Sequence, residues 1–427
     1  MKIIEYPTKE TWTNLLKRPT QTVEDIEHTV LEIFKEVQQK GDMAVNKYTS
    51  LFDGVSLVDY KLPKEFFTSA SASIPEDLKN AISLAKDNIT KFHKAQKTES
   101  IAIETIPGVY CWQEKKPIEK VGLYIPGGTA PLFSSILMLA IPAQLAGCKT
   151  IVLCTPPNNE GHIDPAIIYT AQLCGIETIY RVGGIQAIAA MTFGTDRIPQ
   201  VYKIFGPGNQ YVTVAKQLAT KYGVAIDMPA GPSELLIVAD DTANPAFVAS
   251  DLLSQAEHGI DSQVILVTTS QDLLKEVANE MESQLASLSR KHIAEKAIQN
   301  SKGILVKDHQ TALELINTYG PEHFIICTEN EEFYSQGIEN AGSVFIGNYT
   351  PESAGDYASG TNHTLPTNGY AKQYSGVGLD SFMKRITFQK ISKDGIMAIG
   401  PAIEKMALAE GLTGHKNAVS LRLKSLQ

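Results

Sequence analysis

The sequence lacks the paired cysteines that stabilise small secreted domains or hold structural zinc. It has five cysteines, an odd number, scattered along 427 residues without a C-x-x-C motif. Such cysteines are typical of proteins whose thiols stay reduced. Segments rich in arginine or lysine are also missing, and 38 basic residues against 47 acidic ones give a net charge of −9. We therefore expect no nucleic-acid partner.

No segment has the length and hydropathy of a membrane span. The longest apolar stretch, residues 131–147, is interrupted by two serines, a proline and a glutamine and is too short to cross a bilayer. We expect it to form a buried helix. The first residues, MKIIEYPTKE, have neither the apolar core nor the cleavage site of a signal peptide. We therefore expect a cytoplasmic protein without a membrane partner.

The pattern of apolar residues predicts an α/β protein. Residues 22–40 and 75–95 have apolar side chains at helical spacing, and Gly41 follows the first helix as its expected C-terminal cap. Beyond residue 117, short apolar runs alternate with helical stretches, which is typical of βαβ units and parallel sheets. The runs are VGLYI, TIVLC, ETIYRV, VYKIF, ELLIVA and QVILV. They are numerous enough for two doubly wound sheets.

Glycine-rich connections mark the expected ligand-binding edge. The segments PGGTA, VGG and FGPGN follow predicted strands, and ligands of open α/β sheets bind at the carboxyl ends of strands. The turn at residues 124–129, YIPGGT, offers free backbone amides and a helix N-terminus for an anion or a pyrophosphate. The G-x-G-x-x-G fingerprint is absent, so that motif does not indicate a dinucleotide.

Two side chains near the end of one predicted helix could share a metal ion. The helix begins at Asn244 and ends at Gly259, and its last turn reads SQAEHG. Gln255 and His258 are three residues apart, so both project from one helical face. Alternatively, His258 interacts with the free carbonyls and the negative dipole at the end of the helix.

An adjacent acid and histidine follow a Gly-Pro break. In YGPEH, Glu322 and His323 precede the apolar run FIIC. Histidine titrates near neutral pH and a glutamate can activate water, so the pair suits general base catalysis. Neighbours on a regular strand point to opposite faces, and both can serve one site only if the backbone is irregular, as Pro321 suggests. A solvated turn is the alternative.

Two further segments carry polar residues without clear periodicity. Residues 349–370 are expected to form a loop, and loops of that length are usually functional or disordered. Its residues Asp356 and His363 suit a metal or substrate site. The alternative is a flexible polar loop without such a site. Glu410 and His415 lie in an expected short tail, which we expect from these residues alone to fray, with a site role as the alternative.

The tail is expected to hold one helix, at residues 401–409. Gln255, His258, Asp356 and His415 together offer the nitrogen and oxygen donors that zinc accepts, although no spacing rule assembles them.

Eight segments in order resemble the histidinol dehydrogenase family from about residue 20 to the C-terminus. They are VGLYIPGG, YRVGGIQAIAA, FGPGN, IDMPAGPSE, LLSQAEHG, GPEHF, GDYASGTNHTLPT and AEGLTGHKNAV. The resemblance implies a homodimer that oxidises L-histidinol with NAD and one zinc ion per subunit. Zinc would be bound by Gln255, His258 and Asp356 of one subunit and His415 of the partner. It would position the substrate more than activate a water.

The resemblance also implies the roles of the other residues. His323 would be the base for both oxidations, and Glu322 would activate the water that adds to the bound aldehyde. Tyr124, Gln186 and Asn209 would contact NAD. The substrate would be held by the zinc ligands and by a second group of side chains, Ser233, His323, His363 and Glu410. None of the cysteines matches a catalytic position, and Cys148, Cys154 and Cys327 are interpreted as small core residues.

For the fold we expect two Rossmann-like doubly wound domains without the glycine fingerprint, plus terminal segments that pack in a dimer. Residues 22–123 and 235–377 are predicted to form the first domain, with the metal and catalytic residues. Residues 124–234 are predicted to form the second, NAD-binding domain. The remaining residues, 1–21 and 378–427, are predicted to be an N-terminal arm and a C-terminal dimerisation tail.

Two other functions fit the same residue types. A zinc hydrolase would use Glu322 to activate a metal-bound water, and it would show no dependence on NAD. A periplasmic-type binding protein also has two α/β domains around a cleft, but the missing signal peptide argues against it. The proposed ligand set would also accept manganese or cobalt.

Overall fold

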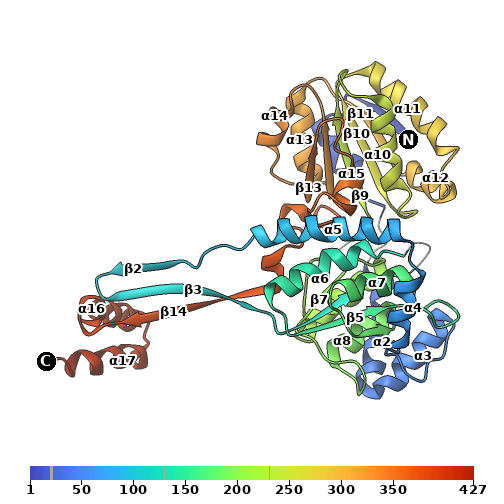
Figure 1. Ribbon diagram of the computed structural model, residues 1–427. Helices are drawn as coiled ribbons and strands as arrows, with labels where there is room; N and C mark the ends of the chain where they lie inside the picture. Colours follow the sequence, from blue (N-terminus) through green and yellow to red (C-terminus); the bar gives the residue numbers. More distant parts are fainter. Residues whose placement is uncertain (20–22, 128–130, 230) are drawn as a thin grey trace.

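The structure, a computed structural model, describes residues 1–19, 23–127, 131–229 and 231–427. Two lobes, each built on a parallel sheet, lie one above the other, and an arm projects sideways from the lower lobe (Figure 1). The predicted α/β class with two doubly wound sheets is confirmed. Among the described residues, no helix is long and apolar enough to cross a membrane.

The lower lobe holds a five-stranded sheet of order β6-β5-β4-β7-β8. All its strand pairs are parallel. The strands are β4 (Lys120–Tyr124), β5 (Thr150–Thr155), β6 (Ile179–Arg181), β7 (Lys203–Phe205) and β8 (Ala225–Ile226). The chain winds outward from β4 in both directions, so the strand order reverses between β4 and β7. Ligands of such sheets bind at that reversal, beyond the carboxyl ends of the strands.

Helices cover both faces of the five-stranded sheet. One face is packed by α4 (Glu65–Ser73), α5 (Glu76–Ala95), α6 (Ser134–Ala146) and α7 (Pro165–Leu173). The other face is packed by α2 (Val23–Lys40), α3 (Asp42–Asp53), α8 (Gly184–Phe193) and α9 (Gln210–Lys221). The predicted buried helix after residue 131 is α6, and its side chains are apolar on all sides because it is enclosed by the lobe.

The upper lobe holds a six-stranded parallel sheet of order β1-β11-β10-β9-β12-β13. The strands are β1 (Lys2–Glu5), β9 (Glu234–Ala239), β10 (Gln263–Thr268), β11 (Lys302–Leu305), β12 (His323–Cys327) and β13 (Ser343–Ile346). Strands β9 to β13 repeat the winding of the lower sheet, and β1 adds one edge strand beside β11.

Helices also cover both faces of the upper sheet. One core contains α10 (Pro245–Ala256), α11 (Gln271–Leu285) and α12 (Lys291–Gln299). The opposite core contains α1 (Trp12–Leu15), α13 (His309–Tyr319) and α14 (Glu331–Gly337). The short helices η1 (Lys9–Thr11), α15 (Glu352–Tyr357), η2 (Tyr370–Lys372) and η3 (Leu379–Phe382) lie in the connections.

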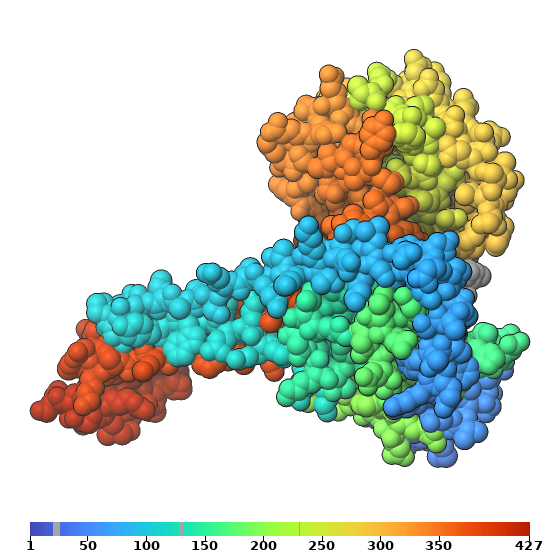
Figure 2. All heavy atoms as spheres, in the orientation of Figure 1, coloured from blue at the N-terminus to red at the C-terminus, as the bar shows by residue number. Residues whose placement is uncertain are grey.

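The arm is a separate antiparallel unit of order β14-β3-β2. It consists of β2 (Ala102–Ile106), β3 (Val109–Pro117) and β14 (Met383–Ile391), followed by α16 (Lys393–Ala409) and α17 (Thr413–Lys424). Its two helices form a small lobe at the far end, away from both sheets (Figures 1 and 2). The expected fraying tail is therefore wrong: α16 begins before the predicted helix at residues 401–409, and α17 was not predicted.

The predicted assignment of residues 22–123 to the catalytic domain is also wrong. The helices α2 to α5 pack in the two cores of the lower sheet, together with the predicted NAD-binding segment. The amphipathic pattern shows which face of a helix is buried but not which sheet buries it, and only the two arm strands β2 and β3 separate α5 from β4 along the chain. The predicted N-terminal arm likewise contributes β1 to the upper sheet of its own chain.

Candidate active site and dinucleotide cleft

Glu322 and His323 lie side by side at the amino end of β12. Helix α13 ends at Tyr319, Gly320 adopts a positive φ of 64°, and Pro321 directs the chain into the strand. His323 is the first residue of β12 and Glu322 precedes it, so the alternation of a regular strand does not separate them. Both side chains are buried, and Glu322 Oε2 is 3.6 Å from His323 Nδ1. The predicted irregular backbone is confirmed.

The surroundings of His323 leave one ring nitrogen free. Nδ1 lies 3.2 Å from the backbone oxygen of Glu234 and 3.2 Å from Gln255 Nε2. A carbonyl oxygen can only accept, so a proton on Nδ1 donates to it, and the amide nitrogen of Gln255 then makes no hydrogen bond to Nδ1. Within the described chain, the buried Nε2 has no hydrogen-bond partner. That tautomer leaves Nε2 able to take a proton from a substrate.

Three possible metal ligands surround the same space. Donor atoms of His258, Glu352 and Asp356 all lie within 4.8 Å of one another. Asp356 Oδ1 is 3.7 Å from His323 Nε2, which joins this group to the Glu322–His323 pair. Gln255, in the last turn of α10, is buried and its Oε1 has no hydrogen-bond partner among the described residues. The structure therefore brings together Gln255, His258 and Asp356.

Glu352 is a site residue that the sequence analysis missed. It lies four residues before Asp356 in α15, and that spacing puts both carboxylates on one helical face. The lack of periodicity in residues 349–370 predicts a loop, whereas the structure forms α15 there. Both carboxylate oxygens of Glu352 are buried without a hydrogen-bond partner in the described chain. The i, i+4 acidic pair was the signal that could have identified it.

The electrostatics of this group favour a bound cation. Burial raises the pKa of Glu352 well above its usual value, despite the opposing effect of His323. Burial would also raise the pKa of Asp356, but its contacts with His323 outweigh that effect and the pKa lies below the usual value. Acidic oxygens that are buried without partners are unstable unless a counter-charge is present. A divalent cation with nitrogen and oxygen ligands fits this set.

The remaining predicted substrate residues divide into two groups. His363 Nε2 lies 3.0 Å from Ser135 Oγ of α6, and its Nδ1 lies 2.9 Å from the backbone oxygen of Asp356. Ser233 directly precedes β9, at the same sheet edge as His323. Glu410 and His415 lie on the arm, at the end of α16 and in α17, where both are exposed. Within one chain, the structure does not bring them to the site.

A second site is a cleft of about 1550 Å³ in the lower lobe. The predicted NAD contacts Tyr124, Gln186 and Asn209 all line it. Tyr124 ends β4, and Gln186 and Asn209 follow β6 and β7, so the cleft lies at the carboxyl edge of this sheet, where the sequence predicts a ligand. The Glu322–His323 pair instead lies at the amino end of the upper-sheet strand β12. Part of the predicted YIPGGT turn, residues 128–129, lies outside the described residues.

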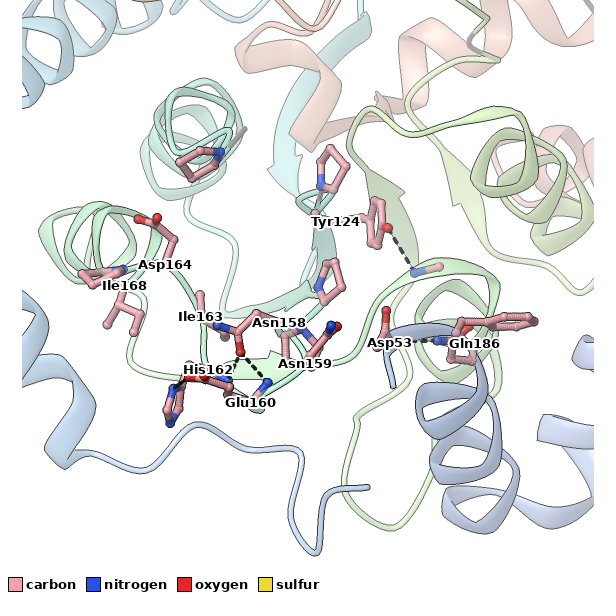
Figure 3. A pocket seen from close by; sticks show the side chains of 18 of the residues that line it. Asp53, Tyr124, Asn158, Asn159, Glu160, His162, Ile163, Asp164, Ile168 and Gln186 are labelled. Atoms are coloured by element: carbon pink, nitrogen blue, oxygen red, sulfur yellow. Dashed lines mark hydrogen bonds and ion pairs between the residues drawn. The ribbon is translucent and has the colours of Figure 1, made fainter. Parts of the chain in front are cut away.

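Polar groups inside the cleft are only partly satisfied. The backbone N–H of Gly184 donates to the Tyr124 hydroxyl at 3.1 Å, and Gln186 Nε2 donates to Asp53 Oδ2 at 3.4 Å (Figure 3). Within the described chain, the buried Gln186 Oε1 has no partner. Burial raises the pKa of Asp53 to about 6. Unsatisfied polar groups beside a strand reversal suit a nucleotide with hydroxyl and amide groups.

The cysteines show no sign of nucleophilic activation. Burial raises the pKa of Cys148 to about 11 and that of Cys327 to about 12, so both remain thiols at neutral pH. Cys154 and Cys327 are buried as predicted, and Cys148 is partly buried against the same core as α6. Cys327 lies at the opposite end of β12 from His323.

Comparisons with known proteins agree with this arrangement. The profile of the family described as histidinol dehydrogenase matches residues 16–423. A histidinol dehydrogenase of Bacteroides thetaiotaomicron is 58% identical over 427 residues, which is 100% of both chains. The crystal structure of histidinol dehydrogenase from Elizabethkingia anophelis has a TM-score of 0.97 and 57% identity, covering 100% of this chain and 98% of that one.

A structure of a probable aldehyde dehydrogenase from Listeria monocytogenes shares the fold, with a TM-score of 0.50 at 15% identity over 90% of this chain and 97% of that one. That likeness concerns the fold alone. The family profile and the highly identical relatives instead extend over nearly the whole chain, through Glu322, His323 and the arm. The chain therefore belongs to the histidinol dehydrogenase family, and it is a dehydrogenase with a place in histidine biosynthesis.

Proposed function

We propose that this enzyme oxidises L-histidinol to L-histidine through bound L-histidinaldehyde, with zinc in the site and two NAD as hydride acceptors. It would carry out these last steps of histidine biosynthesis in the cytoplasm. One observation supports the proposal most strongly. The free Nε2 of His323 faces Asp356 at 3.7 Å, and Asp356 belongs to the possible metal-binding group. A base and a metal site therefore share one buried space.

The unpartnered atoms of the site fit a zinc ion. We assign Gln255, His258 and Asp356 as ligands from one subunit, with His415 of the partner subunit as the fourth. Zinc bound there would hold the imidazole and amino nitrogens of L-histidinol, so that the carbinol carbon faces His323. Glu352 adds negative charge beside these ligands.

Proton transfers are assigned to the adjacent pair. His323 Nε2 accepts the hydroxyl proton while hydride leaves the carbinol carbon for NAD, which yields the aldehyde. Glu322 then orients and deprotonates the water that adds to the aldehyde carbon, while His323 returns its proton to the aldehyde oxygen, which yields the hydrate and a neutral His323. In the second oxidation His323 accepts the proton of the hydrate's hydroxyl group while the second hydride leaves, which yields the carboxylic acid.

The charge on His323 supports a role for the cation. Burial would lower its pKa, but the carboxylates of Glu352 and Glu322 and the contact with Asp356 outweigh this effect and hold the pKa well above its usual value. A base must be neutral before it accepts a proton. A divalent cation beside Asp356 would offset part of the negative charge, and the neutral imidazole would then be favoured at lower pH.

The arm supports the proposal of a homodimer. Its helices and strands expose large apolar side chains that this chain leaves uncovered, which is typical of a protein interface. These include Ile103, Met397, Met406, Leu408 and Leu421. Glu410 and His415 lie on the same two helices, so both would enter the partner's site together. There Glu410 would bind the substrate with Ser233 and His363 of the other subunit.

The test is a count of NADH formed by zinc-loaded protein with limiting L-histidinol and excess NAD. Complete oxidation is expected to give about two NADH per histidinol consumed, with histidine as the product. About one NADH with released aldehyde would contradict the second oxidation. No NADH from folded, zinc-loaded protein would exclude a dehydrogenase and favour the zinc hydrolase.

Glu322→Gln is expected to separate the two oxidations. Glutamine has the shape of glutamate but cannot take a proton from water. Turnover of added L-histidinaldehyde should fall by about 10²-fold or more, while the first oxidation should fall far less. Single-turnover NADH formation with each substrate measures both rates. Equal loss of the two rates would contradict the assignment of Glu322 to water.

A further inference from the structure

We infer that Arg18, in the segment that follows α1, is a positioning residue for the Glu322–His323 pair, acting through Glu234. The inference rests on the proposed roles of that pair. Arg18 touches neither side chain of the pair in the contacts described. Its guanidinium binds the side chain of Glu234, at the start of β9, and the backbone oxygens of the turn that leads into β12.

Residue Glu234 contacts both members of the pair through its backbone. Its N–H donates to Glu322 Oε2 at 2.8 Å, and its carbonyl oxygen lies 3.2 Å from His323 Nδ1. The first contact orients the carboxylate, and the second selects the tautomer that leaves Nε2 free. A displacement of this one residue would therefore disturb both catalytic side chains.

The side chain of Glu234 is fixed by charge. It is 1% exposed, and the Arg18 guanidinium binds both of its oxygens, through Nε to Oε1 and through Nη2 to Oε2 at 2.8 Å. The backbone N–H of Asn368 donates to Oε1 at 2.6 Å. A paired arginine and carboxylate of this geometry has a defined orientation, which a lysine cannot reproduce.

The same guanidinium also holds the turn before the catalytic pair. Arg18 Nη2 lies 3.0 Å from the backbone oxygen of Tyr319 and 3.4 Å from that of Gly320. The guanidinium carbon of Arg18, Cζ, lies 3.9 Å from the centre of the Tyr319 ring. Gly320 and Pro321 lead directly to Glu322. Arg18 therefore links the turn before Glu322 to the side chain of Glu234.

Stability alone does not account for this arrangement. A buried ion pair loses solvation, and apolar residues of similar volume are often equally or more stabilising. Burial in fact raises the pKa of Glu234 in spite of Arg18, so the charged form is held at a disadvantage. The Arg18–Glu234 ion pair does supply directed hydrogen bonds, at the start of β9 and at the turn before β12. The proposed catalytic side chains need such a fixed orientation.

The test compares Arg18→Lys with Glu234→Gln, which keeps the shape of the side chain. Both variants are expected to lower kcat by about 10²-fold, since small misplacements of reacting groups have effects of that size. The KM for L-histidinol and the zinc content should remain unchanged, because the contacts described for Arg18 and Glu234 include none of the proposed zinc ligands. Lys9→Met is the matched control: it removes an exposed ion pair of the same N-terminal segment with Glu314 and should leave kcat unchanged.

Crystal structures of the wild type and both variants give a readout that does not need turnover. Loss of the contact between Glu234 N and Glu322 Oε2 is expected in the variants. Retained contacts, wild-type kcat, or parallel loss of kcat, zinc and thermal stability would each overturn the positioning role. If the proposed function were wrong, the wild type itself would form no NADH, and the crystal structures would still decide the inference about Arg18.

Discussion

Replacing His323 by asparagine is expected to abolish most turnover while zinc remains bound. Asparagine can still donate to the backbone oxygen of Glu234, but it has no basic nitrogen at the position of Nε2. The proposed base serves both oxidations, so kcat should fall by about 10²- to 10⁴-fold for L-histidinol and for L-histidinaldehyde alike. Steady-state kinetics with each substrate, together with metal analysis of the purified variant, measure the effect.

His258→Asn is the matched comparison for this prediction. His258 contributes a donor atom to the possible metal-binding group, so its loss should remove zinc and activity together. His323→Asn should resemble the wild type in zinc content and differ from it in turnover. Equal zinc loss in both variants would show that the division between base and ligand is wrong.

Much of the fold could be predicted because apolar runs report burial directly. The runs VGLYI, TIVLC, ELLIVA and QVILV became buried parallel strands, and the cap at Gly41 ended α2 as expected. The sheet against which each helix packs could not be predicted in this way. Helices α2 to α5 pack against the five-stranded lower sheet. Which sheet a helix packs against depends on how its apolar face fits the face of that sheet.

The site was harder to predict because its members are distant in sequence. Gln255, His323 and Asp356 come from α10, β12 and α15, and each local motif had an ordinary structural alternative. The resemblance to a known family brought them together before the structure did. Glu352 had a signal in the sequence, its i, i+4 spacing to Asp356, whereas Arg18 matched no motif. The unsatisfied burial of Glu352 and the directed contacts of Arg18 are visible only in the folded chain.

Mixing two inactive variants is expected to restore activity if the arm completes the partner's site. In a homodimer of His258→Asn, every site lacks a proposed ligand, and the same holds for His415→Asn. In a mixed dimer, one site would contain His258 of one subunit and His415 of the other, both intact. Random pairing of co-expressed subunits should therefore recover about one quarter of wild-type activity. NADH formation by the co-expressed mixture would measure this recovery, and purified, doubly tagged mixed dimers should reach about one half of wild-type activity.

The control for this experiment pairs His258→Asn with His323→Asn. Both residues belong to the same subunit's part of the site, so each site of the mixed dimer lacks one of them and no activity should return. The exposed residues Glu410 and His415 lie at the end of α16 and in α17, and Figure 1 shows these two helices at the far end of the arm, away from both sheets. If His415 instead completed its own subunit's site, neither mixture would recover activity. Recovery in the first mixture alone would establish that the arm is exchanged between subunits, because no other arrangement provides one intact set of ligands.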